Sequence, residues 1–160
     1  MVIVMPIGIS GSGKSRLYNI SYSDYEKVCP DDIRYELTGN ISDQTRNGSV
    51  FKIAEERIDK CVALNKDVYY DGTNLNKKLR KKFVEKYRGT EGVKIVYVVL
   101  PADIELSNER IRKDISDHKN RSDVPYDVLE RQMKMYEENI KQGFDDENVH
   151  EIIYLEKEEQ

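Results

Sequence analysis

Residues 2–15 read VIVMPIGISGSGKS, and this stretch decides the fold. Residues 2–9 are mostly β-branched or otherwise apolar, without polar alternation, which is typical of a central parallel strand covered on both faces. Glycines 8, 11 and 13 come at its end, and a helix can begin at Ser15. The stretch therefore predicts a strand, a glycine-rich loop and a helix in that order.

The loop from Gly8 to Ser15 matches the phosphate-loop pattern G-x-x-x-x-G-K-[ST] in full. Glycines let the backbone approach a ligand closely, so that successive N–H groups and a helix N-terminus can surround a phosphate. We expect Lys14 to reach the β- and γ-phosphates of ATP or another nucleoside triphosphate, and Ser15 to offer its hydroxyl to Mg²⁺. The predicted nucleotide ligands in this loop are Gly8, Ser10, Gly11, Ser12, Gly13, Lys14 and Ser15.

Strands and helices alternate along the rest of the chain. Strands are predicted over residues 25–29, 67–70, 93–100 and 152–155. Helices are predicted from Asp31, from Ser49 as N-cap to Leu64, over residues 75–87 and 103–116, and from Pro125 to about Gln142. This alternation indicates one α/β domain over residues 1–160, a P-loop kinase fold with a five-stranded parallel sheet, helices on both faces and a helical lid at about 108–124.

The composition of the chain limits the kinds of binding partner and the cellular location that we expect. The chain has 30 acidic and 26 basic residues, a formal net charge of -4, which argues against coating nucleic acid by bulk charge alone. No run of 18 apolar residues and no basic leader occur, so we expect no membrane span or secretory signal and a cytoplasmic location, in a bacterial cell or a phage-infected host. Cys29 and Cys61 have no metal-binding spacing and are expected to be reduced thiols, and His118 and His150 are expected to be solvated.

Two polar turns follow predicted strands. Asp31, Asp32 and Arg34 follow the second strand, and residues 71–74, Asp-Gly-Thr-Asn, follow the third. In phosphoryl transfer a carboxylate orients the acceptor hydroxyl and takes its proton, while a cation attracts an anionic acceptor. The structural alternatives stay open at this point: Asp31 as a helix cap with Arg34 solvated, and Asn74 as the N-cap of the next helix.

The motifs together resemble a known family. The phosphate loop, the Asp31-Asp32-x-Arg34 turn, residues 71–76 (DGTNLN) and residues 124–129 (VPYDVL) stand in the order and approximate spacing of the kinase domain of phage-type polynucleotide 5′-kinase/3′-phosphatases. The similarity covers roughly residues 1–140. It implies transfer of the γ-phosphate of ATP to a 5′-hydroxyl end of DNA or RNA, and the length implies that the 3′-phosphatase half is absent.

The resemblance also implies roles for individual residues. Asp31 would be the general base, Arg34 would contact the 3′-phosphate of the acceptor, and Asp71 would be a second essential carboxylate near Arg34. A lid arginine would contact the donor phosphates, and Arg121 is the nearest candidate, with Arg110 and Arg112 as alternatives. Thr73 and Asn74 complete the substrate-binding set that the resemblance implies.

Other interpretations remain at the level of sequence. A GTP switch is disfavoured because Asn65-Lys66-Asp67 lacks the spacer of the guanine-reading Asn-Lys-x-Asp motif. A small-molecule kinase acting on a sugar, nucleoside or antibiotic hydroxyl would use the same loop, base and lid, and a non-catalytic nucleotide-binding partner would bind ATP without transfer. Residues 77–88 carry seven basic residues against one acidic residue, which indicates either a nucleic-acid contact or a solvated helix face.

Overall fold

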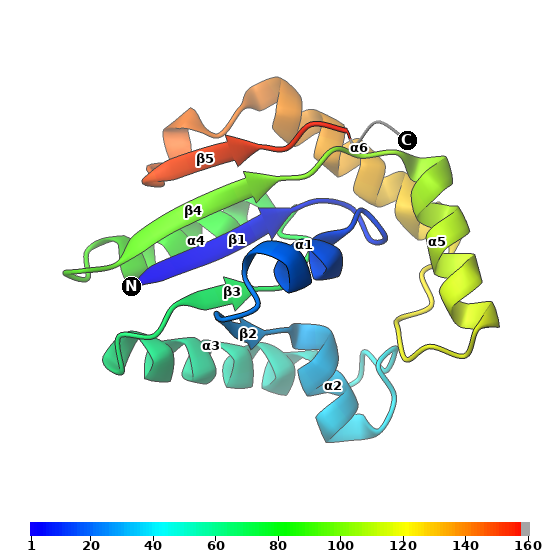
Figure 1. Ribbon diagram of the computed structural model, residues 1–160, viewed down its shortest axis with the longest axis horizontal. Coiled ribbons are helices and arrows are strands. Elements are labelled where there is room, and N and C mark those ends of the chain that lie inside the picture. Colours follow the sequence, from blue (N-terminus) through cyan, green and yellow to red (C-terminus); the bar gives the residue numbers. More distant parts are fainter. Residues whose placement is uncertain (158–160) are drawn as a thin grey trace.

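The computed structural model describes residues 1–157, which form a five-stranded, all-parallel sheet (Figure 1). The strand order is β2-β3-β1-β4-β5, so that β1 lies at the centre and β2 and β5 form the two edges. The predicted α/β P-loop kinase fold is confirmed. The strand bounds are Val2–Ile7 for β1, Glu26–Val28 for β2, Val68–Tyr70 for β3, Lys94–Val99 for β4 and Glu151–Tyr154 for β5.

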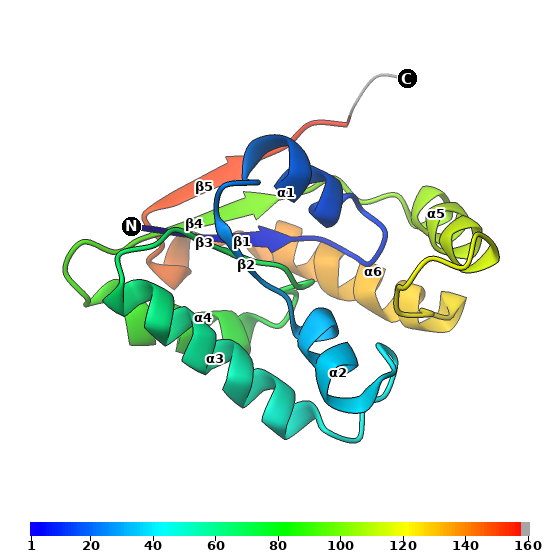
Figure 2. The ribbon, with the colours of Figure 1, turned by 60° about the horizontal axis from the view of Figure 1, so that its bottom comes forward.

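Helices cover both faces of the sheet. Figure 2 shows α1 above the sheet and α3 and α4 below it, while α5 lies beyond the carboxyl end of β4. The helix bounds are Lys14–Ser21 for α1, Pro30–Thr38 for α2, Asn47–Ala63 for α3, Lys77–Arg88 for α4, Ile104–Ser116 for α5 and Tyr126–Gln142 for α6. A 3-10 turn over Asp145–Glu147, η1, precedes β5.

Side chains of β1 alternate between two cores. Ile3, Met5 and Ile7 are almost fully buried in the larger core, which also takes side chains from α3, α4 and α6. Val4 joins the smaller core under α1, against Leu17. Because β1 pairs with β3 on one side and β4 on the other, its carboxyl end is held in the middle of the sheet. The phosphate loop that follows therefore starts from the centre of the sheet.

One predicted helix cap, Ser49, is wrong, and the alternative that Asn74 caps the next helix is excluded. Helix α3 begins two residues before Ser49, because Val50 N–H already donates to the carbonyl of Arg46. The N-cap of α4 is Asn76, whose Oδ1 accepts from Leu79 N–H at 3.0 Å, and not Asn74.

The basic helix α4 turns much of its charge toward other elements. Arg80 is 1% exposed, Lys77 pairs with Asp146 and Lys86 pairs with Glu55 and Asp59. The helix packs under the sheet, on the face opposite α1 (Figure 2). These contacts favour the structural interpretation of residues 77–88 over a nucleic-acid contact.

Candidate active site

The phosphate loop leads directly into the N-terminus of α1. Gly13, the residue before the helix, has φ 104°, a left-handed conformation that favours glycine. Gly11, at φ 75°, lies against α5, because a Cβ at this position would come within 2.8 Å of the carbonyl oxygen of Ser107. The glycine pattern therefore serves two purposes, a turn that aims N–H groups at a ligand and a close approach of the lid helix.

Lys14 is held inside this loop. Its Nζ donates to the carbonyl oxygens of Ile9 at 2.7 Å and Gly8 at 3.2 Å. Burial lowers the pKa of Lys14 to about 8, and the carboxylate of Asp71 opposes this shift. Tyr69 Oη donates to the carbonyl of Lys14 at 2.7 Å and so fixes the first turn of α1. The ammonium is positioned where the phosphates of a nucleotide would replace the loop carbonyls as its partners.

One buried polar group of the phosphate loop is unsatisfied within residues 1–157. Among the described residues, the hydroxyl of Ser12 is buried without a hydrogen-bond partner. The N–H of Ser10 donates to Oε1 of Gln132 on α6, at 2.8 Å. Because an unpaired buried hydroxyl costs free energy, the loop is better satisfied with a phosphate in it. These observations fit the predicted nucleotide ligands.

Asp71 faces the first turn of α1. Its Oδ2 lies 3.4 Å from Ser15 Oγ and 3.6 Å from Lys27 Nζ. Residues 1–157 contain no cluster of three or more histidine, cysteine or carboxylate ligands. Mg²⁺ is commonly held by one or two oxygen ligands together with substrate phosphates, and the Ser15–Asp71 pair fits that requirement.

Lys27 is a site residue that the sequence analysis missed. It lies on the edge strand β2, lines the same cleft and stacks its ammonium over the ring of Tyr18, 5.3 Å from the centroid. A lone lysine in a short, weak strand carries no motif. Its place in the site becomes visible only when β2 pairs with β3, which brings Lys27 next to Asp71.

Asp31 and Arg34 form an ion pair at the start of α2. Arg34 Nη1 lies 2.5 Å from Asp31 Oδ1, and its Nε and Nη2 donate to Oδ1 of Asn47. The Arg34 side chain is 5% exposed and that of Asp31 is 47% exposed. Burial raises the pKa of the Asp31 carboxyl above its ordinary value, and the Arg34 guanidinium opposes that rise. Asp31 lines the cleft and Arg34 stands behind it.

A pH profile can test this pair. In the Arg34→Gln variant the cation that lowers the pKa of Asp31 is lost, so the pKa should rise further. The acid limb of kcat/KM against pH should then move to higher pH, because the base is protonated over a wider range. Arg131→Gln, which breaks an exposed pair with Asp127 within α6, should leave the limb in place. An unmoved limb in a folded Arg34 variant would contradict the assignment.

The expected proximity of Asp71 to Arg34 takes a different form. The Arg34 guanidinium donates to Asp31 and Asn47, while the Asp71 carboxylate contacts Ser15 and Lys27. The two carboxylates still interact through space, since the charge of Asp71 raises the pKa of Asp31. Asp71 thus contacts the hydroxyl that is predicted to bind Mg²⁺ and forms no ion pair with Arg34 among the described residues.

Thr73 and Asn74 hold the loop after β3 to β1. The carbonyl of Thr73 accepts from Gly8 N–H at 3.1 Å, and Asn74 Nδ2 donates to the carbonyl of Pro6 at 2.8 Å. Thr73 lines the cleft, whereas Asn74 lies outside its lining and has a left-handed φ of 51°. Asn74 therefore connects the ends of β1 and β3 by hydrogen bonds.

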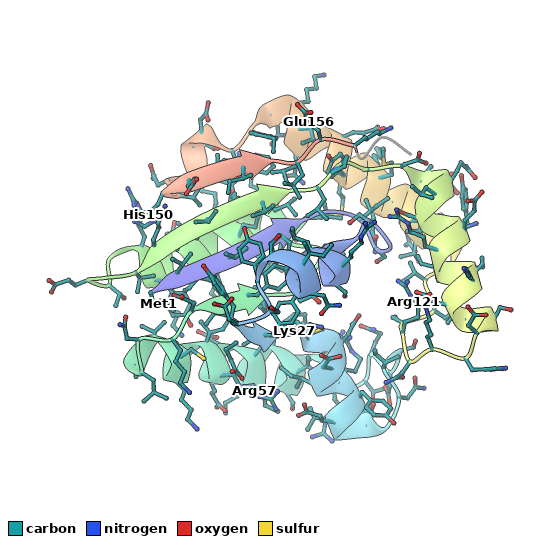
Figure 3. All side chains as sticks on the ribbon, viewed as in Figure 1. Met1, Lys27, Arg57, Arg121, His150 and Glu156 are labelled. Atoms are coloured by element: carbon teal, nitrogen blue, oxygen red, sulfur yellow. The ribbon has the colours of Figure 1, made fainter. Side chains whose placement is uncertain are left out.

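The three candidate lid arginines have different partners. Arg112 pairs with Asp123 and the carbonyl of Val124, within the lid itself. Arg110 donates to the carbonyl of Gly11 in the phosphate loop, at 3.1 Å. Arg121 is anchored by Asp114 at 2.8 Å, and its buried Nε has no partner among the described residues. Figure 3 shows Arg121 on the side of the lid that faces the sheet.

The two cysteines are free thiols, and of the two histidines His118 is exposed, as expected. Burial raises the pKa of the Cys29 thiol to about 12, so it stays protonated in the cleft. The prediction that His150 is merely solvated is wrong in part, because its Nδ1 accepts from Ile95 N–H at 3.0 Å.

The phosphate loop, Asp31, Asp71, Arg110 and Arg121 line one open cleft of about 1560 Å³ at the carboxyl ends of the strands. Fold and site together define a P-loop, kinase-like, nucleotide-binding protein. Residues 2–139 match the model of the AAA domain family, and the chain belongs to that family. No helix within residues 1–157 combines the length and apolar character needed to span a membrane.

Comparison with solved structures supports the fold. The chain is similar to a chain of the Pnkp1/Rnl/Hen1 RNA repair complex, with a TM-score of 0.75 and 20% identity over 89% of this chain and 46% of that one, so it spans about half of that chain. It is also similar to a gluconokinase from Sinorhizobium meliloti 1021 (TM-score 0.53, 19% identity, 95% and 80% covered). A shikimate kinase from Acinetobacter baumannii is similar too (0.52, 17%, 98% and 84%). No curated protein sequence matches the chain.

Proposed function

We propose that the chain is an ATP-dependent polynucleotide kinase that transfers the γ-phosphate to the 5′-hydroxyl end of DNA or RNA. The observation that carries the proposal is the Asp31–Arg34 pair, in which a half-exposed carboxylate faces the phosphate-loop cleft while a buried guanidinium 2.5 Å away orients it. A carboxylate held in this way is suited to accept the proton of an acceptor hydroxyl.

The size of the cleft favours a polymeric acceptor. At about 1560 Å³ and open to solvent, it exceeds the roughly 300–1,000 Å³ of ordinary small-molecule pockets. ATP would fill only part of this space. The remainder leaves room for a terminal nucleotide and the chain attached to it.

The side chains of the cleft have different roles in the proposed reaction. Asp31 takes the proton from the attacking hydroxyl, and Lys14 with Arg121 stabilises the negative charge on the phosphates. Ser15 and Asp71 would hold Mg²⁺, which supplies further neutralisation of phosphate charge when bound. Alignment of the acceptor, the γ-phosphate and the leaving group by these side chains accounts for catalysis without a covalent intermediate.

A small-molecule kinase is the second candidate. Similarity to the RNA repair complex supports a polynucleotide acceptor, whereas similarity to the gluconokinase and the shikimate kinase supports a small acceptor. All of these identities lie below 25%, so the acceptor must be decided by experiment.

The direct test uses the chain with ATP, Mg²⁺ and a 5′-hydroxyl oligonucleotide. Mass spectrometry should detect one added phosphate per strand, on DNA, RNA or both, and none on a strand that already carries a 5′-phosphate. Gluconate and shikimate serve as small acceptors in parallel. Phosphate gain on either of them, without gain on an oligonucleotide, would replace the proposal by the small-molecule alternative. ATP binding without any transfer would indicate a non-catalytic protein.

A further inference from the structure

A second cavity, of about 270 Å³, lies at the β2 edge of the sheet, between this strand and α3. We call it the edge groove. Its charged lining is mainly basic, since it contains Lys27, Arg57, Lys60 and Lys66 against the single acid Glu26. This surface is separate from the basic helix α4.

The edge groove begins where the active-site cleft ends. Lys27 lines both cavities, and its Nζ lies 3.6 Å from Asp71, which in turn lies 3.4 Å from Ser15 Oγ. Figure 3 shows Lys27 below α1 and Arg57 further from the cleft, on α3. A chain that leaves the cleft past Lys27 therefore meets the other basic residues next.

The backbone of β2 adds polar groups to this path. Glu26 N–H donates to the carbonyl of Asp67 and Val28 C=O accepts from Asp71 N–H, on either side of β3, and the hydrogen-bonding groups of alternate residues in a parallel strand point to opposite sides. The N–H and C=O of Lys27 consequently point to the open edge, where no described strand pairs with β2.

Two of the four basic residues of the groove have acidic partners, since Lys27 lies 3.6 Å from Asp71 and Arg57 pairs with Glu36, and the other two are unpaired within residues 1–157. Lys60 and Lys66 are exposed and form no ion pair within residues 1–157, and Arg57 shares its charge with Glu36, at 2.6 Å. On α4, Lys77, Arg80 and Lys86 have acidic partners, whereas the other four basic residues of that helix form no ion pair within residues 1–157. In the groove, Lys60 and Lys66 therefore remain available for an external anion.

We propose that the edge groove binds the phosphodiester backbone of the acceptor strand, on the 3′ side of the nucleotide whose 5′-hydroxyl faces Asp31. This inference rests on the proposed function and extends it from the reacting end to the following nucleotides. Arg57 and Lys60 stand one helical turn apart, with Cβ atoms about 5–6 Å from each other, a spacing that suits successive phosphates of a single strand. A small acceptor would end inside the cleft and gain nothing from these cations.

Kinetics with two acceptor lengths test the groove. The Lys60→Gln/Lys66→Gln variant should lose about 25-fold in kcat/KM for a 5′-hydroxyl decanucleotide at 0.1 M salt. Each phosphate contact with a single strand releases about 0.7 counterions, so the loss of two contacts lowers the exponent of the salt dependence by about 1.4, which corresponds to about 25-fold at this salt concentration. The rate with a dinucleotide, which is too short to reach the groove, should be unchanged. Lys78→Gln, an exposed lysine of α4, is the matched control and should change neither rate. An unaffected decanucleotide rate, or an equal loss for both lengths, would overturn the proposal.

A binding measurement separates this proposal from the proposed function. If the wild-type chain phosphorylates no oligonucleotide, the proposed function fails, and fluorescence anisotropy with a labelled single-stranded decanucleotide still decides the groove. The slope of log affinity against log salt should be about 1.4 smaller in the double variant than in the wild type and the Lys78 variant. Equal slopes, or equal displacement of the decanucleotide by a polyglutamate of the same length, would overturn a site for phosphodiesters.

Discussion

Replacing Asp31 by asparagine is expected to lower kcat for phosphoryl transfer by about 10²–10⁴-fold while ATP affinity stays unchanged. The side chain keeps its size, and an amide oxygen can still accept the hydrogen bond from Arg34 that Oδ1 now accepts. An amide cannot take a proton from the acceptor hydroxyl, so the attacking oxygen is no longer activated. Single-turnover transfer from radiolabelled ATP to a 5′-hydroxyl oligonucleotide measures this step without product release.

Asp32→Asn supplies the control for this variant. Asp32 is the next residue of α2, also lines the cleft and is exposed, but it lacks the ion pair with Arg34. The same loss of charge at this position should change kcat by a small factor. A fall in ATP affinity as large as the fall in kcat, or equal losses for Asp31→Asn and Asp32→Asn, would contradict a proton-accepting role for Asp31.

The second large effect concerns stability. Arg80→Met is expected to lower the free energy of unfolding by about 3–5 kcal/mol, because it leaves a buried carboxylate without its cation. Arg80 Nε and Nη2 each lie 2.9 Å from an oxygen of Glu147, and the two side chains are 1% and 0% exposed. Tyr97 Oη also donates to Glu147, and Asn139 accepts from Arg80. Urea denaturation followed by circular dichroism gives the change.

A double variant distinguishes lost pairing from lost packing. Arg80→Met/Glu147→Leu removes both charges together, so it should recover much of the stability lost in Arg80→Met. The exposed pair of Lys77 with Asp146, at the same end of α4, is the comparison, and Lys77→Met should cost less than about 1 kcal/mol. If the double variant is no more stable than Arg80→Met, the buried charge is not the source of the loss.

The local parts of the site follow from the sequence because their spacing is short. Eight consecutive residues, Gly8 to Ser15, place the lysine, the hydroxyl and the glycine turns on one loop, and the preceding apolar run predicts the central strand. Asp31 and Arg34 are three residues apart on one helix, so their pairing is accessible to the same reasoning. The periodicity of apolar residues and the spacing of the motif residues thus predict the class of protein and the phosphate-binding residues.

Contacts between distant segments could not be predicted in this way. The basic run of residues 77–88 has the composition of a nucleic-acid surface, yet Arg80 is buried against Glu147, 67 residues away. Gln132 reaches the Ser10 N–H from 122 residues away, and no motif marks it. Arg110, Arg112 and Arg121 look equivalent in sequence, but each has a different partner in the structure.

The α/β fold, the phosphate loop and the candidate base follow from sequence patterns, since each depends on residues that are neighbours along the chain or share one periodic element. Tertiary structure alone decided which charges are available. The parallel order β2-β3-β1-β4-β5 puts Lys27 beside Asp71 and leaves the β2 edge open, while the contacts of α4 with η1 and α3 pair three of the seven basic residues of the more conspicuous basic run with acids. The burial and the pairing of a charged side chain depend on which helices and strands pack against each other, and the composition of a segment does not specify its packing partners.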